Sequence, residues 1–330
     1  MEKSKYSVSV VIATYNGARY LDKQLESIFS QTIQPDEIII SDDNSNDDTI
    51  SIINSHIKDS NLKIRIFKND RTLGYGKNFE IAITKANCDY IFFSDQDDYW
   101  FPEKIETVLK ISKENSGKLI FINDAVITDK NLVPSGVTKI EQYINSGMSL
   151  AHFSQGCCFT IKKELKKMIL PIPNFYDSHD NWINKISNAL NAATIIYKPL
   201  QYYRMHDENV SGYFLNTTKK TSRGKYYKNR LKKIISKKNN NFLTNDAKAL
   251  KEIISRAKKI EIQEINNSYI KEKDVLVRRL NSINMRIKIK SQPFFKRFSF
   301  ALKSLFNSDY KYYHNGVNSF FRDILFKENV

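Results

Sequence analysis

Three carboxylates follow an apolar run in the first third of the chain. Residues 91–94 have the composition of a buried strand, and Asp95, Asp97 and Asp98 come directly after it. At neutral pH the charges of these side chains repel one another, which does not favour folding. Hard divalent cations prefer oxygen ligands, so the cluster predicts a cation site. Asp97 is the expected ligand, and Asp95 is expected to contact the ion or a ribose hydroxyl; the alternative is a solvated acidic turn.

Two other apolar runs also end in polar residues. Residues 7–13 lead into residues 14–16, and residues 37–41 lead into Asp42 and Asp43. Helical patterns separate the runs, which favours parallel strands whose carboxyl ends meet at one rim of a sheet. Ligands of such sheets bind beyond those ends. Asp43 is therefore expected to accept hydrogen bonds from a base or a sugar, although a helix-capping turn would also use an aspartate here.

The first expected strand lacks the glycine-rich loop that binds phosphate in many nucleotide-binding folds. Neither GxGxxG nor GxxxxGK(S/T) follows it. A nucleotide bound at this rim would therefore need a metal ion to neutralise its phosphates. The aspartate cluster is the candidate for holding that ion.

Three residues further along the chain complete the candidate site. Asp180 stands at the expected start of a helix, where it could deprotonate an acceptor hydroxyl as a general base or simply cap the helix. Arg204 supplies a fixed positive charge after the last expected strand, and His206 close to it is a candidate metal ligand. A single histidine is more often structural, so both interpretations of His206 stay open.

Short apolar runs alternate with helical patterns over the first two thirds of the chain. This alternation predicts an α/β fold with a Rossmann-like, mostly parallel, doubly wound sheet flanked by helices. The expected strands are residues 7–13, 37–41, 62–67, 90–94, 119–123, 157–161 and 194–197. The expected helices are residues 21–29, 49–57, 78–86 and 180–189.

Positive charge is concentrated at the end of the chain. The net charge is +16, yet residues 1–212 carry 24 basic and 27 acidic residues, whereas residues 213–330 carry 28 and 9. A border at residue 212 therefore separates a near-neutral α/β domain from a basic, aromatic-rich helical module. We expect this module to bind an anionic membrane surface. The alternatives are a polyanion such as nucleic acid, and a helical cap with ordinary lysine faces.

The helical module is expected to contain helices at residues 226–235 and 247–286, a loop at 236–241 and an aromatic, basic stretch at 294–326. No signal segment and no apolar run of membrane-spanning length occur in the sequence. The three cysteines are too few and too unevenly spaced for a disulfide framework or a zinc site. The protein is therefore expected in the cytoplasm, peripheral on the inner face of the plasma membrane.

In their order, these motifs resemble the family 2 inverting glycosyltransferases with the GT-A fold, in the style of the bacterial rhamnosyltransferase-like branch. The resemblance spans residues 6–212 and is carried by residues 10–16, 42–49, 95–100, 179–180 and 203–212, of which residues 95–98 give an extended DxD motif. It implies a nucleoside-diphosphate-sugar donor, UDP- or dTDP-linked, with Mn²⁺ or Mg²⁺ bridging the diphosphate. The acceptor would be a hydroxyl of a cell-surface glycan or of a lipid-linked oligosaccharide.

The resemblance also implies a role for each matching residue. Asp97, Asp95 and His206 would hold the metal, and Asp180 would be the catalytic base of a single inverting displacement. The nucleotide-sugar would lie against Thr14, Tyr15, Asn16, Asp43, Lys77, Asn78, Asp95, Gln96 and Arg204.

Two other classes of protein are compatible with parts of the sequence. A nucleic-acid-binding protein would explain the basic module, but the acidic rim would have no purpose and no helix-turn-helix, zinc or RNA-binding motif accompanies the charge. A phospho-accepting, receiver-like domain would explain aspartates after two strands, but the expected sheet extends well past the length of such a domain. Nucleic acid is therefore not the expected partner.

Overall fold

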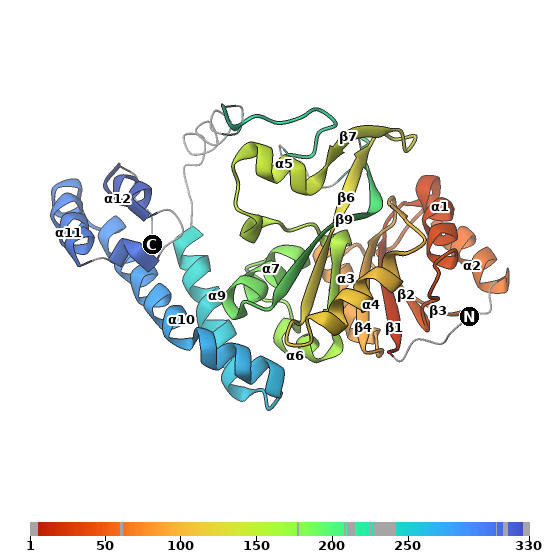
Figure 1. Cartoon of the computed structure of the whole chain (residues 1–330), viewed down its shortest axis with the longest axis horizontal. Helices are drawn as coiled ribbons and strands as arrows, with labels where there is room; N and C mark the ends of the chain where they lie inside the picture. Colours follow the sequence, from red (N-terminus) through yellow and green to blue (C-terminus); the bar gives the residue numbers. More distant parts are fainter. Residues whose placement is uncertain are drawn as a thin grey trace. The chain divides into compact units, whose positions relative to one another are not determined.

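The computed structural model describes residues 6–59, 62–176, 178–207, 209, 215–224, 226, 242–307, 309–312 and 316–325. The chain forms two compact units, Met1–Asn188 with Ala192–Asn229, and Ala189–Asn191 with Arg230–Val330 (Figure 1). The expected border between residues 212 and 213 falls outside the described residues. The division of the sequence at that point stays a prediction.

A mixed sheet forms the centre of the first unit. Its strands lie in the order β3-β2-β1-β4-β8-β6-β9-β5, with β7 added beside β6. The first four are mutually parallel, and β6 is parallel to β9. The strands are β1 Val8–Thr14, β2 Glu37–Asp42, β3 Lys63–Lys68, β4 Tyr90–Asp95, β5 Tyr99–Trp100, β6 Ile120–Thr128, β7 Pro134–Thr138, β8 Phe159–Lys162 and β9 Ala193–Arg204.

Helices cover both faces of the parallel part of the sheet. On one face, Val10 and Ile12 of β1 pack in a core with apolar residues of α1, α2 and α4. On the other face, Phe93 of β4 stacks on Phe79 of α3. Strands covered on both faces are continuous apolar runs, which is why β1, β2 and β4 were predictable. The helices are α1 Ala18–Phe29, α2 Thr49–Asp59, α3 Tyr75–Lys85, α4 Lys104–Glu114, α5 Lys139–Ser146, α6 Lys166–Ile169 and α7 His179–Leu190.

The expected α/β fold with a mostly parallel sheet is confirmed, but the strands β5 and β7 were not expected, and β8 differs from its expected range. The run at residues 157–161 forms β8 only from Phe159, and β8 is antiparallel to both neighbours. Cys157 instead belongs to a 3-10 turn, η2 Gly156–Cys158. Two further short 3-10 turns, η1 Leu150–His152 and η3 Lys163–Leu165, flank this region. An antiparallel strand needs no crossover helix, so the strict alternation of strands and helices ends here.

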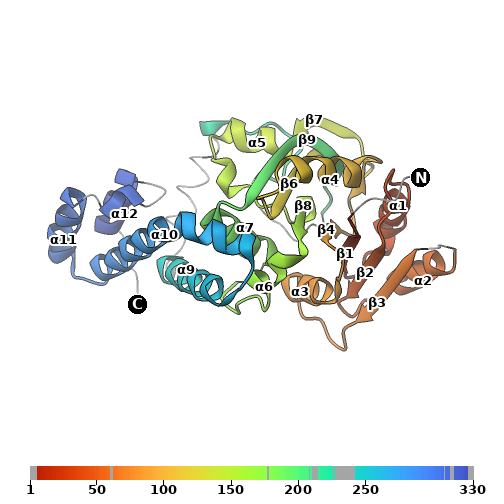
Figure 2. The same cartoon turned by 60° about the horizontal axis from the view of Figure 1, so that its bottom comes forward.

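The second unit is helical in its described part, as expected (Figures 1 and 2). The expected helix at residues 247–286 is two helices, α9 Phe242–Lys259 and α10 Gln263–Lys290, and α9 packs along α10. The aromatic stretch forms α11 Phe294–Phe306, η4 Asp309–Tyr312 and α12 Gly316–Leu325. Most of the expected helix at 226–235 and the expected loop at 236–241 lie outside the described residues. No described helix is long and apolar enough to cross a membrane.

Candidate functional site

The carboxyl ends of three strands lie side by side at one rim of the sheet. Thr14, the last residue of β1, pairs with Asp42 of β2. On the other side of β1, Ala13 pairs with Asp95, the last residue of β4. The register therefore brings the three polar strand ends together, as expected from the sequence.

Asp42 and Asp43 have different structural roles at this rim. Asp42 forms the turn after β2: its Oδ1 accepts a hydrogen bond of 2.9 Å from the Ser45 amide, and its Oδ2 accepts one of 2.9 Å from the Thr14 hydroxyl. The buried Asp43 accepts hydrogen bonds from the amides of Leu73 and Gly74, both 2.8 Å. These two bonds hold the loop before α3 against the rim. They do not cap the helix that follows β2, and they leave the expected contact of Asp43 with a nucleoside a prediction.

Gln96 fixes the loop that follows β1. Its side-chain amide accepts a hydrogen bond from the Tyr15 amide at 2.9 Å and donates one to the Tyr15 carbonyl at 3.0 Å. Asn16 has a left-handed backbone, with φ of 48°, and its amide donates to the Ser45 hydroxyl at 2.9 Å. These bonds order the loop and leave the Tyr15 ring exposed.

Two expected nucleotide-binding residues of α3 differ in position. Asn78 is buried, and its side-chain amide donates to the Thr14 carbonyl at 3.1 Å, so it joins α3 to the end of β1. Lys77 forms an ion pair of 2.7 Å with Glu80 of its own helix and reaches the Ile172 carbonyl at 3.5 Å. The lysine is thus already engaged with these two partners.

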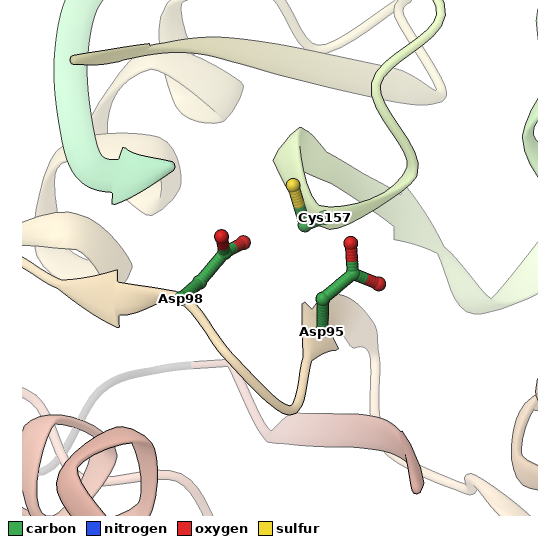
Figure 3. A group of neighbouring side chains, drawn as sticks. All are labelled: Asp95, Asp98 and Cys157. Carbon is green, nitrogen blue, oxygen red and sulfur yellow. The ribbon is translucent and has the colours of Figure 1, made fainter. Parts of the chain in front are cut away.

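Asp95 and Asp98 lie together with Cys157 at the carboxyl end of β4 (Figure 3). One candidate ligand atom from each residue lies within 4.8 Å of the other two. Asp98 is buried: its Oδ2 accepts a hydrogen bond of 2.8 Å from Gln201, and its Oδ1 has no partner among the described residues. A buried carboxylate oxygen without a donor is an unfavourable arrangement that a cation would relieve.

The electrostatics of the cluster favour a bound cation. Burial, and then the charge of Asp97, raise the pKa of Asp98 to about 7. Burial, followed by the charges of Asp98, Asp97 and Asp180, raises the pKa of Asp95 well above its ordinary value. The two carboxylates therefore fit a divalent cation, which would restore their ionised forms.

Asp97 is grouped differently from the expected metal ligands. Its Oδ2 lies 2.6 Å from Nε2 of His206, and the side-chain amide of Asn209 donates to the same oxygen at 3.2 Å. Arg204 donates to the main-chain carbonyl of Asp97 at 2.7 Å, and its guanidinium lies 4.7 Å from the centre of the Tyr20 ring. The structure thus brings Asp97, Arg204 and His206 together, beside the pair formed by Asp95 and Asp98.

Asp180 lies in the first turn of α7, as expected. Its Oδ1 accepts hydrogen bonds from the Ser178 hydroxyl and, at 2.8 Å, from the Asn181 amide. Its charge contributes to the raised pKa of Asp95, which places it within electrostatic range of the cluster. Ser178 itself accepts from the Asn181 amide at 3.2 Å, so a residue other than Asp180 is available to cap this end.

His179 packs the start of α7 against the sheet. Its buried ring lies 4.0 Å from the centre of the Phe79 ring and 5.8 Å from that of Phe93. Burial lowers the pKa of His179 to about 4, so the ring is neutral at pH 7. A Cβ at Gly156 would lie 2.7 Å from the His179 Nε2. A glycine is therefore needed where the turn that carries Cys157 approaches α7.

Comparison with known proteins identifies the family. The sequence model described as Glycosyl transferase family 2 matches residues 9–168. WfaP of Escherichia coli, a UDP-Glc:alpha-D-GlcNAc-diphosphoundecaprenol beta-1,3-glucosyltransferase, is 34% identical over 206 residues, which cover 62% of this chain and 79% of that protein. The chain belongs to glycosyltransferase family 2.

A second relative and a solved structure agree with this assignment. The dTDP-rhamnosyl transferase RfbG of Shigella flexneri is 31% identical over 247 residues, which cover 68% of this chain and 83% of that protein. The mannosyltransferase PcManGT of Pyrobaculum calidifontis, solved with GDP-Man and Mn²⁺, has 14% identity and a TM-score of 0.50, covering 78% of this chain and 75% of that chain. This structural likeness supports the fold alone, and the chain is a GT-A glycosyltransferase by its family and its sheet.

The sequence analysis did not predict a buried polar network that contacts Asp98. The Lys104 ammonium donates to the Gln201 side chain at 2.5 Å and to the Cys157 carbonyl at 3.2 Å. Gln201 in turn donates to Asp98, so one chain of hydrogen bonds joins α4, η2, β9 and the acidic cluster. Burial lowers the pKa of Lys104 to about 8. The available signal was a lysine on the same helical face as the buried Ile105 and Val108.

Proposed function

We propose that this glycosyltransferase moves a sugar from a nucleoside-diphosphate-sugar to a hydroxyl of a lipid-linked oligosaccharide or cell-surface glycan, with inversion at the anomeric carbon. The observation that carries the proposal is the acidic cluster of Asp95 and Asp98 at the carboxyl end of β4, beside Asp97. The buried carboxylate of Asp98 and the half-buried carboxylate of Asp95 fit a cation, and a cation is what a diphosphate without a glycine-rich loop requires.

The donor is expected to lie along the rim. Asp43 and Asn78 order the loops on one side, and the exposed ring of Tyr15 is available to contact a base or ribose. UDP- and dTDP-linked sugars are the preferred donors, because two relatives in the family are named for UDP-glucose and dTDP-rhamnose. Arg204, held against the Asp97 carbonyl, would favour the nearby negative charge of a diphosphate.

Mn²⁺ or Mg²⁺ is the proposed cofactor, to be held by Asp97 and Asp95 with Asp98 as an additional ligand. When bound, such an ion stabilises negative charge on a leaving diphosphate. His206, at 2.6 Å from Asp97, would fix the orientation of that carboxylate or join the ligand set. PcManGT, which shares the fold, was solved with Mn²⁺, and this supports a divalent ion without separating Mn²⁺ from Mg²⁺.

Asp180 is the proposed general base. Its carboxylate accepts bonds from Ser178 and Asn181, so its position in the first turn of α7 is defined. It would take the proton from the acceptor hydroxyl as that oxygen attacks the anomeric carbon from the face opposite the leaving diphosphate. One displacement of this kind inverts the configuration.

The acceptor proposal comes from the relatives and from the charge of the last third of the chain. WfaP is named for a diphosphoundecaprenol-linked sugar. Residues 213–330 carry 28 basic and 9 acidic residues, which suits an anionic leaflet. The protein is therefore proposed to act peripherally at the cytoplasmic face of the membrane.

Transfer assays test the proposal directly. The purified chain is incubated with UDP-, dTDP- and GDP-sugars, a diphosphoundecaprenol-linked acceptor and Mn²⁺, and the product is analysed by mass spectrometry and NMR. The proposal predicts a product of inverted anomeric configuration from one donor class, which is lost in Asp180→Asn and kept in the matched control Asp22→Asn on the exposed side of α1. A product with retained configuration, or full turnover of Asp180→Asn, would contradict the mechanism.

A further inference from the structure

The second unit carries an apolar stripe on the outer face of α11. Phe295, Phe298, Leu302 and Phe306 follow one another at helical spacing, and their exposed fractions are 86%, 51%, 37% and 80%. We call these four residues the α11 stripe. The opposite face of the helix, which contains Ala301 and Ser304, is buried.

The α11 stripe is not an unfilled part of the core of its own unit. That core is formed by Ile289, Ala301, Tyr310, Phe320 and Ile324, with Leu305 packed against it. Next to α11, α12 is joined to α10 by a buried bidentate ion pair, in which Arg286 donates to Asp323 at 2.7 and 2.8 Å. The helices are thus already held together without the stripe. Three exposed phenylalanines on one helix face form a group, unlike the single apolar residues scattered over most protein surfaces.

Lysines lie directly beside the stripe. At 100° per residue, Lys296 and Lys303 fall on the arc of α11 that adjoins Phe295 and Phe306. Between residues 285 and 325 the sequence has eight basic and two acidic residues. A second copy of the chain would bring these like charges together, so the charge pattern disfavours self-association through this face and favours an anionic surface.

We propose that the α11 stripe docks on an anionic lipid bilayer, with its apolar side chains among the acyl chains and Lys296 and Lys303 at the lipid phosphates. A helix with aromatic residues on one face and lysines along its edge lies in the membrane interface rather than across it. This placement agrees with the length and polarity of the described helices, none of which could span. The link to catalysis rests on the proposed function, because a lipid-linked acceptor is presented at such a surface.

Vesicle flotation of the full chain tests this docking surface. Vesicles of phosphatidylcholine with 30% phosphatidylglycerol are compared with vesicles of phosphatidylcholine alone. The wild-type chain is expected to float with the anionic vesicles, and less so at high salt. Phe295→Ser with Phe306→Ser should lower the apparent affinity at least about tenfold, because two large apolar side chains no longer enter the bilayer.

Matched variants separate docking from other effects. Ile270→Ser removes another well-exposed apolar side chain, 69% exposed, from the distant half of α10 and should leave flotation unchanged. Lys296→Gln with Lys303→Gln should weaken binding to anionic vesicles only. Circular dichroism and thermal unfolding of each variant should match the wild type, since the stripe lies outside the core.

Several results would overturn the docking surface. They are unchanged flotation of the double phenylalanine variant, a loss of dimerisation in that variant while flotation persists, or a selective loss of binding to single-stranded DNA. Donor hydrolysis in vesicle-free solution should be the same in the wild type and the phenylalanine variant. If the chain transferred no sugar but flotation still depended on Phe295 and Phe306, the proposed function would fail and the docking surface would stand.

Discussion

Replacing Asp98 by asparagine tests the electrostatic basis of the candidate site. Burial raises the pKa of this carboxyl from 3.8 to about 7. The folded protein therefore binds the proton more tightly than the unfolded chain, so stability falls as pH rises from about 4 to about 7 and stays low above that. At about 1.4 kcal/mol per pKa unit, the ionised Asp98 costs the metal-free protein up to ~4 kcal/mol at pH 8.

Asp98→Asn removes this cost and keeps an oxygen that can accept from Gln201. We expect the metal-free variant to exceed the wild type in unfolding free energy by ~1–4 kcal/mol at pH 8, and to equal it near pH 4. Chemical denaturation in EDTA at the two pH values measures the difference. Mn²⁺ should then stabilise the wild type much more than the variant, since one ligand oxygen and its charge are gone.

A buried aspartate elsewhere in the same unit supplies the control for this experiment. Asp124 in β6 accepts hydrogen bonds from the amides of Ala125 and Ile140, at 2.8 and 2.9 Å. Asp124→Asn should leave the response to Mn²⁺ unchanged. A variant Asp98→Asn that is less stable than the wild type at pH 8 without metal, or equal stabilisation of both proteins by Mn²⁺, would show that Asp98 is not an unfavourable charge relieved by a cation.

Three further predictions concern catalysis, metal binding and the second unit. Asp180→Asn should slow transfer by ~10²–10⁴-fold with donor affinity nearly unchanged in calorimetry, and an equal loss of donor affinity would argue against the base role. EDTA should abolish transfer. The affinity for Mn²⁺ should rise with pH up to about 7, because protons compete with the ion for Asp98. An affinity for Mn²⁺ that is constant from pH 5.5 to 8 would contradict this competition. Arg286→Met should lower the unfolding free energy of the second unit by about 3–5 kcal/mol, because Asp323 stays buried without this partner. In denaturant unfolding, the double variant Arg286→Met with Asp323→Leu should recover most of that loss. Equal losses in the single and double variants would exclude the ion pair as the cause.

The parallel half of the sheet was predictable because its strands are buried on both faces. Val8–Thr14, interrupted only by Ser9, and Tyr90–Asp95 are apolar runs that end in polar residues, so both the strands and their common rim follow from the sequence. The two-residue strand β5 Tyr99–Trp100 was not predictable. It pairs with Tyr202 and Gln201, about a hundred residues away, and has too few residues for any periodicity.

The composition of the acidic cluster also depends on contacts between residues far apart in the sequence, which local patterns do not predict. The three aspartates were found from their spacing, but Cys157 reaches Asp95 and Asp98 through a 3-10 turn far along the chain, where the apolar pattern indicated a strand. The contact of Asp97 with His206 likewise joins residues 109 positions apart. Spacing predicts neighbours within one strand or helix, whereas the partner that each carboxylate selects depends on how distant loops fold together.

Crystals soaked with Mn²⁺ and an accepted nucleoside-diphosphate-sugar would show, through the anomalous scattering of the metal, whether the aspartate cluster holds the ion that binds the donor. We expect a single strong peak at the carboxyl end of β4, from an ion bound by oxygens of Asp95, Asp97 or Asp98 and by the donor diphosphate. A donor bound at the rim with no metal beside these carboxylates, or Mn²⁺ bound elsewhere in the chain, would contradict it.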